Sequence, residues 1–296
     1  MSYRSYILMK ETMGKITGVL MFILAVGSVL LFIGQDMLFG KVLWWFPEGI
    51  SEHSKAIDQQ FMWTLVVVGI SFTAAQFALG YAVVRFGRKG NTRAVYTHGS
   101  NKLEITWTMI TAAVFVVLAI LGQRVWANLH LNEAPADSAR IDVVAQQFQW
   151  NFHYPGADGT LGKTEAKYID DSGLNFVGLD PNDAAGKDDA QLTTLIIPVN
   201  RPVELTLKSK DVIHSFFVPA LRFKQDSLPG MAIKVHFTAT KEGKYEIPCA
   251  ELCGNLHNNM KSNMIVIPGD EFDQLMAMSE EKFKEQLGAL TDRYQY

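Results

Sequence analysis

The sequence predicts a membrane protein of the α+β class, with three N-terminal transmembrane helices, an all-β barrel or sandwich, and a C-terminal amphipathic helix. Long uncharged apolar runs are confined to residues 1–126, and apolar–polar alternation follows them. The net charge of −3 is unevenly spread: residues 1–126 carry 11 Lys+Arg against 6 Asp+Glu, and residues 127–296 carry 16 against 24. We therefore expect a membrane anchor over 1–126, an extramembrane domain over 127–270, and a helix or tail over 271–296.

The three apolar runs cover residues 16–34, 61–84 and 105–123. A helix needs about 20 apolar residues to span a bilayer. A buried helix of a soluble protein is the alternative for any one run, but three in succession with charges only at their ends favour membrane spans. The first run also resembles a cleaved signal peptide. It exceeds the usual apolar stretch of about 7–15 residues and no small-residue cleavage motif follows it, so we expect it to be retained.

Basic residues predict the orientation of these helices. The segment Arg85–Glu104 carries five Lys or Arg residues, whereas Gln35–Gln60 carries only two. Because loops rich in Lys and Arg stay in the cytoplasm, the N-terminus and the Arg85–Glu104 loop are expected there. Residues beyond 126 are then expected on the outer side, which is the periplasm if the protein lies in a bacterial inner membrane.

Period-two patterns after residue 127 predict a β domain with turns at Pro-Gly and Asn-Arg-Pro sequences. The predicted strands are Ile141–Tyr154, Leu192–Val199, Val203–Leu207, Met231–Thr240, Lys244–Ile247 and Met264–Ile267. Residues 156–190 form an acidic insertion with eight Asp or Glu residues against three lysines. Its composition is equally compatible with a solvated loop and with a docking surface. Helical spacing of apolar residues predicts an amphipathic helix over Glu271–Leu287.

Both cysteines of the chain occur in one short segment, which runs from Cys249 to Met260 and also contains Cys253 and His257. Soft sulfur ligands combined with imidazole favour copper. A Cys249–Cys253 disulfide and a zinc site with one further ligand are the alternatives. Two cysteines exclude a four-thiolate cluster within the chain, and the haem-attachment pattern C-x-x-C-H is absent from the sequence.

The pattern Cys-x-Glu-x-Cys-Gly-x-x-His-x-x-Met closely resembles the CuA loop of the cytochrome c oxidase subunit II family. Three further segments resemble elements of that family: Asp211–Phe216, which contains His214, Lys224–Gly230, and Leu103–Thr108 at the start of the last transmembrane helix. The resemblance extends over about residues 96–268.

The resemblance implies a cupredoxin-like domain that holds a binuclear copper centre. Cys249 and Cys253 would bridge two copper ions, and His214 and His257 would each bind one of them. Weak axial ligands would come from Met260 and the backbone carbonyl of Glu251. The Glu251 carboxylate would in addition bind magnesium at the interface with subunit I, for which a hard oxygen ligand is suited.

Three further residues acquire expected roles from the resemblance. Glu104 matches a glutamate at the entrance of a proton pathway into subunit I, although an ordinary interfacial charge is the alternative. Phe148 aligns with the exposed tryptophan at which electrons enter, and Trp150 aligns with a second tryptophan of that strand. Packing is the alternative for both aromatic residues, and phenylalanine at position 148 departs from the family pattern.

The function implied is electron entry into a respiratory oxidase. The copper pair would accept electrons from cytochrome c and pass them to haem in subunit I, where oxygen is reduced and protons are pumped; haems would belong to the partner subunit alone. Other oxidase subunits and membrane lipid are expected partners, and nucleic acid is not. The alternatives are the copper subunit of a nitric oxide reductase, a membrane-tethered copper carrier, and a disulfide-bearing assembly protein. A quinol oxidase subunit is disfavoured because the copper ligands are present.

Overall fold

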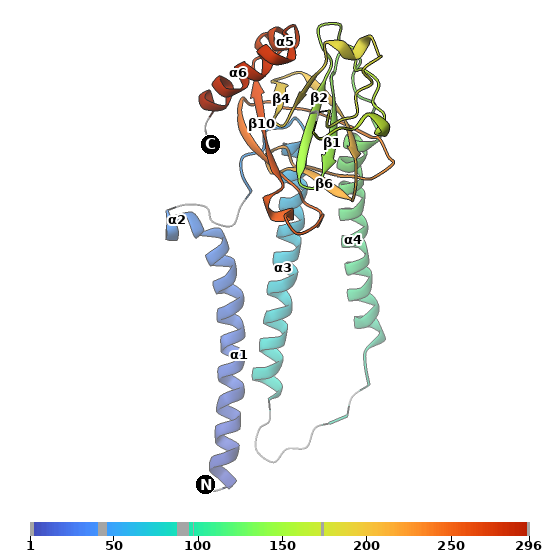
Figure 1. The fold of residues 1–296 in the computed structure, drawn as a ribbon. Helices are drawn as coiled ribbons and strands as arrows, with labels where there is room; N and C mark the ends of the chain where they lie inside the picture. The colour runs from blue at the N-terminus through green and yellow to red at the C-terminus, as the bar shows by residue number, and fades with distance from the viewer. Residues whose placement is uncertain (1–2, 41–45, 88–94, 97, 173–174, 295–296) are drawn as a thin grey trace. The chain divides into compact units, whose positions relative to one another are not determined.

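The computed structural model describes residues 3–40, 46–87, 95–96, 98–172 and 175–294, and it divides into two compact units (Figure 1). The first unit contains the residues up to 40 together with 58–124, and the second contains 46–57 and 125–294. Arg88, Lys89 and Arg93, three of the basic residues used to predict the orientation, lie outside the described residues.

Three long apolar helices provide the membrane-spanning part, which confirms the expected fold class. They are α1 (Tyr3–Ile33), α3 (Ser54–Phe86) and α4 (Asn101–His130), with a short helix α2 (Gln35–Phe39) after the first. The candidate spans within them are Leu8–Ile33, Ser54–Phe86 and Asn101–His130. They are longer than the predicted uncharged runs because each helix continues into polar or charged residues at its ends.

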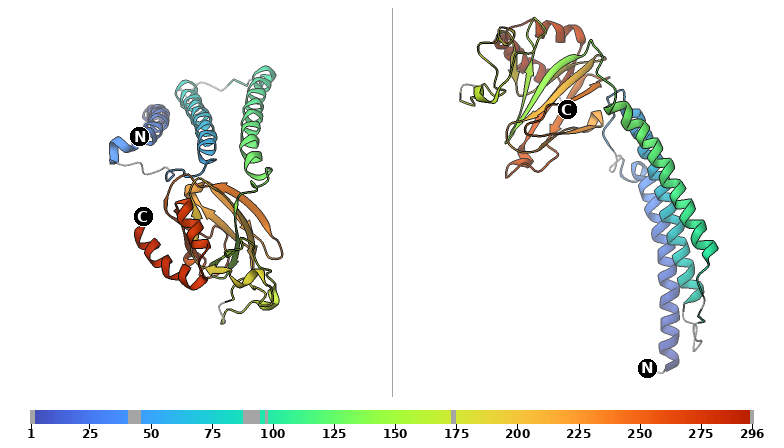
Figure 2. Two further views of the ribbon diagram at one scale, coloured as in Figure 1. Left: turned by 90° about the horizontal axis from the view of Figure 1, so that it is seen from above. Right: turned by 90° about the vertical axis from the view of Figure 1, so that its right-hand side faces the viewer.

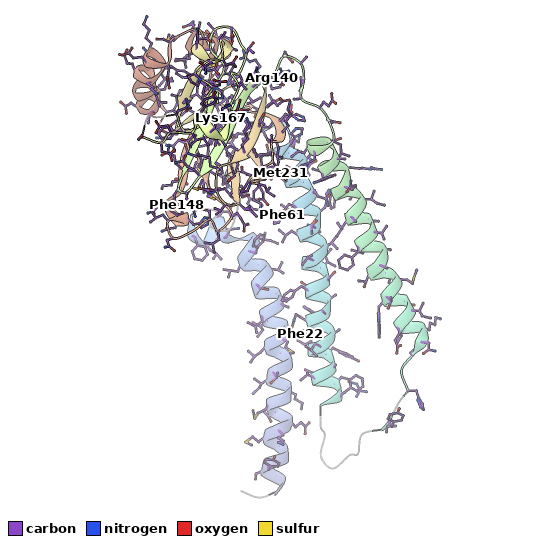
Figure 3. All side chains as sticks on the ribbon, turned by 45° about the vertical axis from the view of Figure 1, so that its right-hand side comes forward. Phe22, Phe61, Arg140, Phe148, Lys167 and Met231 are labelled. Carbon is purple, nitrogen blue, oxygen red and sulfur yellow. The ribbon has the colours of Figure 1, made fainter. Side chains whose placement is uncertain are left out.

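Helices α1 and α3 approach closely at two glycines. A Cβ atom on Gly18 would lie 2.3 Å from a methyl carbon of Val84, and one on Gly80 would lie 3.0 Å from the ring of Phe22. Phe22, labelled in Figure 3, also packs on Phe77 with ring centroids 4.9 Å apart. Small residues permit this approach, and van der Waals contact is the main attraction between helices in lipid.

The described residues of the second unit form three sheets. Figures 1 and 2 show the ribbon of this β domain. The five-stranded sheet has the order β3-β2-β1-β5-β8, the three-stranded sheet β4-β10-β9, and the last β6-β7. Their bounds are β1 (Ala139–Gln146), β2 (Gln149–Tyr154), β3 (Ala190–Leu192), β4 (Leu195–Pro198), β5 (Pro202–Ser209), β6 (His214–Val218), β7 (Phe223–Ser227), β8 (Ile233–Thr238), β9 (Gly243–Pro248) and β10 (Lys261–Ile267). Four short 3-10 turns, η1 (Ala166–Tyr168), η2 (Ala185–Lys187), η3 (Pro219–Leu221) and η4 (His257–Asn259), lie in the connections.

Three predicted elements are each divided in the structure. The stretch Ile141–Tyr154 forms β1 and β2, which pair antiparallel across a turn at Gln147 and Phe148. The stretch Leu192–Val199 is interrupted between β3 and β4, which belong to different sheets. The C-terminal segment forms α5 (Gly269–Met276) and α6 (Glu280–Arg293), because Ser279 is extended and Glu280 and Glu281 occupy the favourable first turn of a new helix. The apolar–polar alternation of the sequence does not predict strands β6 and β7.

The core of the second unit lies between the sheets and includes a residue from the connection between α1 and α3. Ile50 is 1% exposed, and its backbone N–H donates to the carbonyl of Ala220 at 2.8 Å. Its carbonyl accepts from Thr240 N–H at 2.7 Å. The short segment 46–57 is therefore part of the β domain's packing although it lies within the predicted anchor 1–126.

The acidic insertion is held in place by its own carboxylates. Each of its eight Asp and Glu side chains has a hydrogen-bond or ion-pair partner within the domain, and four of those partners lie within two residues. Asp170, for example, accepts from the Ser172 N–H at 2.9 Å, and Asp180 accepts from the Asn182 N–H at 2.9 Å. Aspartates that cap turns in this way stabilise loops without regular secondary structure.

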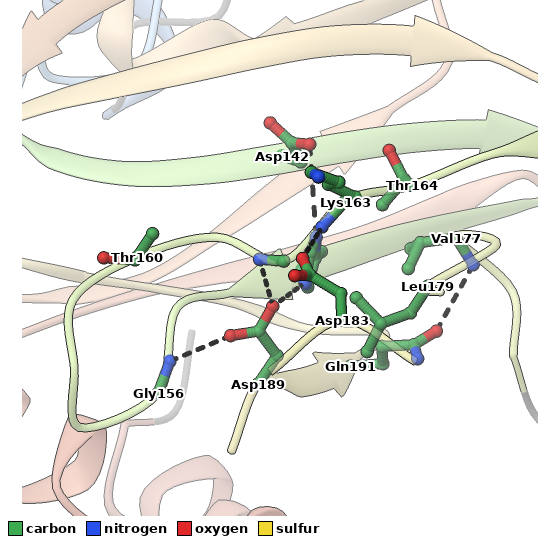
Figure 4. A network of polar contacts seen from close by, with 12 residues as sticks. Asp142, Gly156, Thr160, Lys163, Thr164, Val177, Leu179, Asp183, Asp189 and Gln191 are labelled. Atoms are coloured by element: carbon green, nitrogen blue, oxygen red, sulfur yellow. Dashed lines mark hydrogen bonds and ion pairs between the residues drawn. The ribbon is translucent and has the colours of Figure 1, made fainter. Parts of the chain in front are cut away.

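A buried contact connects the insertion to β2 (Figure 4). Asp189 accepts from the backbone N–H groups of Gly156 and Gly162 at 3.2 and 2.7 Å, and its carboxylate lies 2.6 Å from Nε2 of His153. The side chains of His153 and Asp189 are both fully buried. One carboxylate thus joins the two ends of the first loop of the insertion to the sheet.

We predict that Asp189→Ala destabilises the β domain by about 3 kcal/mol, because it leaves a buried imidazole and two backbone N–H groups without their acceptor. Thermal unfolding of the solubilised protein and mass spectrometry of protease fragments would measure this effect. Cleavage should increase within residues 156–190. Asp158→Ala is the control, since that exposed carboxylate accepts from the nearby Thr160 N–H; equal behaviour of the two variants would contradict the assigned role of Asp189.

Candidate metal centre

The segment Cys249–Met260 is the connection between β9 and β10, and hydrogen bonds hold both of its ends. The Cys249 N–H donates to the Met260 carbonyl at 3.0 Å, which continues the antiparallel pairing of the two strands. The Ala250 N–H donates to the Ser215 carbonyl at 3.0 Å, and the backbone of Cys249 forms an isolated antiparallel β-bridge with Phe216. These bonds hold the loop beside the first residues of β6, where His214 lies.

Six donor atoms converge between this loop and β6. The two Sγ atoms lie 3.9 Å apart. Cys249 Sγ is 3.9 Å from Nδ1 of His214 and 3.3 Å from the carbonyl oxygen of Glu251. Cys253 Sγ is 3.6 Å from Nδ1 of His257 and 3.7 Å from Sδ of Met260. Each thiol therefore has one imidazole and one weaker donor beside it.

The donor set fits a metal centre better than it fits a disulfide. Both cysteines are free at an Sγ–Sγ distance of 3.9 Å, about twice that of a disulfide bond. His214, Cys249 and Cys253 offer ligand atoms that all lie within 4.8 Å of one another. Two thiols and two imidazoles also match a zinc site. The thioether of Met260 is a soft ligand that zinc sites do not use and that copper accepts.

Four of the donor residues are buried, whereas His257 is partly exposed. His214 is fully buried, and Cys249, Cys253 and Met260 are 7%, 3% and 1% exposed. Removing thiolates and imidazoles from water favours their coordination to a cation, and a closely packed shell restricts changes of geometry.

Burial acts to raise the pKa of both thiols, but the resulting pKa shifts of Cys249 and Cys253 have opposite directions. At Cys249, hydrogen bonds with His214 and with the Ser215 backbone outweigh burial and lower the pKa below that of an ordinary cysteine. At Cys253, burial and the adjacent Cys249 charge both raise the pKa. The pair therefore releases one proton readily and retains the second until a cation offsets the added negative charge.

Asp211 orients one of the imidazoles. Its Oδ1 lies 2.8 Å from Nε2 of His214, so the other ring nitrogen, Nδ1, faces Cys249. Burial lowers the pKa of His214, but its contacts with Cys249 and Asp211 outweigh burial and raise it. A carboxylate behind a metal-binding histidine fixes the tautomer and the ring orientation. Asp211 belongs to a segment with family resemblance, but the sequence had assigned it no role.

The other residues with expected roles have different surroundings. Phe148 is half-buried at the margin of the β domain, where Figure 3 labels it. Trp150 is 1% exposed and packs edge-on against Phe216 and His214, so a docked partner would reach Phe148 and not Trp150. The Glu251 side chain is exposed, whereas its carbonyl faces the Cys249 thiol. Glu104 is exposed in the first turn of α4.

Known proteins resemble the chain over both of its parts. The family model "Cytochrome C oxidase subunit II, periplasmic domain" matches residues 140–267, and the corresponding transmembrane-domain model matches residues 41–125. Helix α1 precedes the matched region.

Individual relatives agree with these matches. The alternative cytochrome c oxidase subunit 2 of Bradyrhizobium diazoefficiens is 33% identical, over 83% of this chain and 86% of that protein. The cytochrome c oxidase subunit 2 of Thermostichus vulcanus is 29% identical, over 77% and 76%. The crystal structure of the periplasmic domain of cytochrome oxidase subunit II of Bradyrhizobium japonicum is 28% identical and covers 51% of this chain and 99% of that one, with a TM-score of 0.37.

The two family models and the Bradyrhizobium diazoefficiens relative together show that this chain belongs to the cytochrome c oxidase subunit II family, and therefore to a cytochrome c oxidase complex.

Proposed function

We propose that this chain is the electron-entry subunit of its oxidase and that Cys249, Cys253, His214, His257, Met260 and the Glu251 carbonyl hold a binuclear copper centre. The observation that carries the proposal is the pair of unbonded, buried thiols, each flanked by an imidazole and a weaker donor. Copper held there by the two thiolates and the two imidazoles would supply one-electron redox chemistry. The surrounding residues exclude water and hold the donors in place, so little rearrangement accompanies each transfer.

Electron delivery to the centre is proposed to occur at the surface that carries Phe148. Its ring lies against the Cys249–Met260 loop, since a Cβ atom on Gly254 would come within 3.0 Å of two ring carbons of Phe148. The net charge of −8 over residues 127–296 would attract a cationic cytochrome c and accelerate its association.

Electron transfer onward is proposed to lead to haem in subunit I, where oxygen reduction is coupled to proton pumping. The exposed Glu251 carboxylate is proposed to bind magnesium at that interface, for which a hard oxygen donor is suited. Glu104 is proposed to stand at the entrance of a proton pathway, because it is exposed at the start of α4. This arrangement rests on a cytoplasmic N-terminus and a periplasmic β domain in a bacterial inner membrane, in accord with the basic Arg85–Glu104 loop.

Copper content and electron paramagnetic resonance test the centre itself. The purified protein should contain two copper ions per chain that share one unpaired electron, and Cys253→Ser should abolish this signal because one bridging thiolate is lost. Circular dichroism should show that the β domain remains folded. One localised copper, zinc in its place, or an unchanged signal in Cys253→Ser would reject the proposal.

Copper loading of the metal-free protein should release protons. Because the thiol pair retains one proton at neutral pH and the pKa of His214 is raised, we expect at least one proton for each centre formed at pH 7, from Cys253 and in part from His214. The number should rise below the lowered pKa of Cys249 and fall above the raised pKa of Cys253. Calorimetry in two buffers of different ionisation enthalpy measures it, and release of no protons at pH 7 would show that both thiols are already ionised.

Replacement of Phe148 tests the entry surface. Phe148→Ala should lower kcat/KM for reduced cytochrome c by about tenfold, since central aromatic contacts dominate many interfaces. The wild-type rate should fall as salt screens the acidic domain. The copper signal of the variant must match that of the wild type for the effect to be assigned to docking. A kcat/KM equal to that of the wild type would contradict the proposal that electrons enter at the surface carrying Phe148.

A further inference from the structure

The turn between β1 and β2 contacts the candidate metal centre at two separate points, and both involve Gln147. Its side-chain amide nitrogen, Nε2, donates to the Cys253 carbonyl at 2.5 Å. Its backbone N–H donates to Oδ2 of Asp211 at 2.7 Å. Cys253 belongs to the loop between β9 and β10, and Asp211 belongs to the segment that precedes β6. A single residue therefore contacts both segments that supply the ligands.

The Asp211 contact extends to a ligand. Asp211 uses Oδ2 to accept from Gln147 and Oδ1 to contact Nε2 of His214, so its carboxylate lies between the turn and the imidazole. The carboxylate of Asp211 also accepts from the Val212 N–H at 2.7 Å. With both oxygens occupied it has little freedom to rotate, and the His214 ring is oriented accordingly.

The close approach of the turn to the loop does not depend on one hydrogen bond alone. Gly254 follows Cys253 and has a φ of +139°, a region that side chains disfavour. A Cβ atom at this position would lie 2.8 Å from Nε2 of Gln147 and 3.0 Å from the Phe148 ring. The loop backbone therefore lies directly against the turn, and the glycine makes that contact possible.

Neighbouring glutamines provide an internal comparison. Gln149 donates to the side chain of Asn151 at 2.7 Å, and Gln146 accepts from Asn151 and Lys210 at 3.2 and 2.6 Å. Of these three glutamines in the described part of the chain, Gln147 is the one whose side chain donates to the Cys249–Met260 loop. Its amide is therefore placed for a task that the other two side chains do not share.

We propose that Gln147 is a positioning residue for the metal centre: its amide fixes the backbone at Cys253, and its N–H fixes Asp211 and through it His214. The proposal rests on the copper function proposed above. Its consequence is that the turn which carries Phe148, the loop between β9 and β10, and the segment from Asp211 to His214 move as one unit. Donor docking and ligand geometry are thereby connected through bonds of a single residue.

The test compares Gln147→Met and Gln147→Glu with the control Gln149→Met in the full-length, detergent-solubilised oxidase. Methionine has a similar length to glutamine without the amide donor, and glutamate places an oxygen opposite the Cys253 carbonyl. Both variants retain the backbone N–H bond to Asp211. We expect an altered copper hyperfine pattern in both, a shifted reduction potential, and loss of copper to a chelator about tenfold faster than in the wild type. Gln149→Met should match the wild type in all three measurements.

The outcomes separate the two proposals. If the wild-type protein lacks the shared-electron copper signal, the proposed function fails and the role of Gln147 fails with it. If the wild type shows the signal and both Gln147 variants match it in hyperfine pattern, potential and copper loss, only the role of Gln147 is overturned. Near-UV circular dichroism identifies a variant that does not fold, and Gln147→Asn, whose shorter amide cannot reach equally far, then replaces it with the same expected changes.

Discussion

The antiparallel pairing of β9 with β10 is the constraint on which the rest of the candidate centre depends. Pairing places Pro248 opposite Lys261 and brings Cys249 N–H to the Met260 carbonyl, so the intervening loop must fold back on itself. Strand β6 contacts the same loop through Phe216 and Cys249. A sheet can hold a twelve-residue ligand loop rigidly because the loop's ends are joined by backbone hydrogen bonds, which side-chain substitutions other than proline leave in place.

Electrostatics make the paired thiols a site for a cation. Two adjacent buried thiols cannot both ionise without charge compensation, and the opposite pKa shifts of Cys249 and Cys253 express this repulsion. His214 and Asp211 favour the first thiolate, whereas the second proton is retained. A soft metal cation held by the two cysteines would remove the conflict, since it would supply positive charge and replace the lost hydration.

The acidic charge of the β domain has two physical roles. Within residues 156–190 the carboxylates cap turns, pair with lysines or bind buried His153, so they hold an otherwise irregular segment together. Their local pairing does not cancel the net charge of residues 127–296, which remains −8. The potential of that charge acts beyond individual contacts and is the component relevant to a charged partner.

The sequence by itself determined the three apolar helices, the β character of the domain and the ligand loop. Hydropathy, period-two alternation and the Cys249–Met260 motif all depend on residues that are adjacent in the sequence. It could not divide Ile141–Tyr154 into two strands, since alternation continues through Gln147 and Phe148 while the chain reverses there. Nor could it show that Gln147 and Asp211, 64 residues apart, meet behind the His214 imidazole, or that Trp150 is buried while Phe148 is only half-buried. Those facts depend on strand pairing between distant segments, and only the tertiary structure decided them.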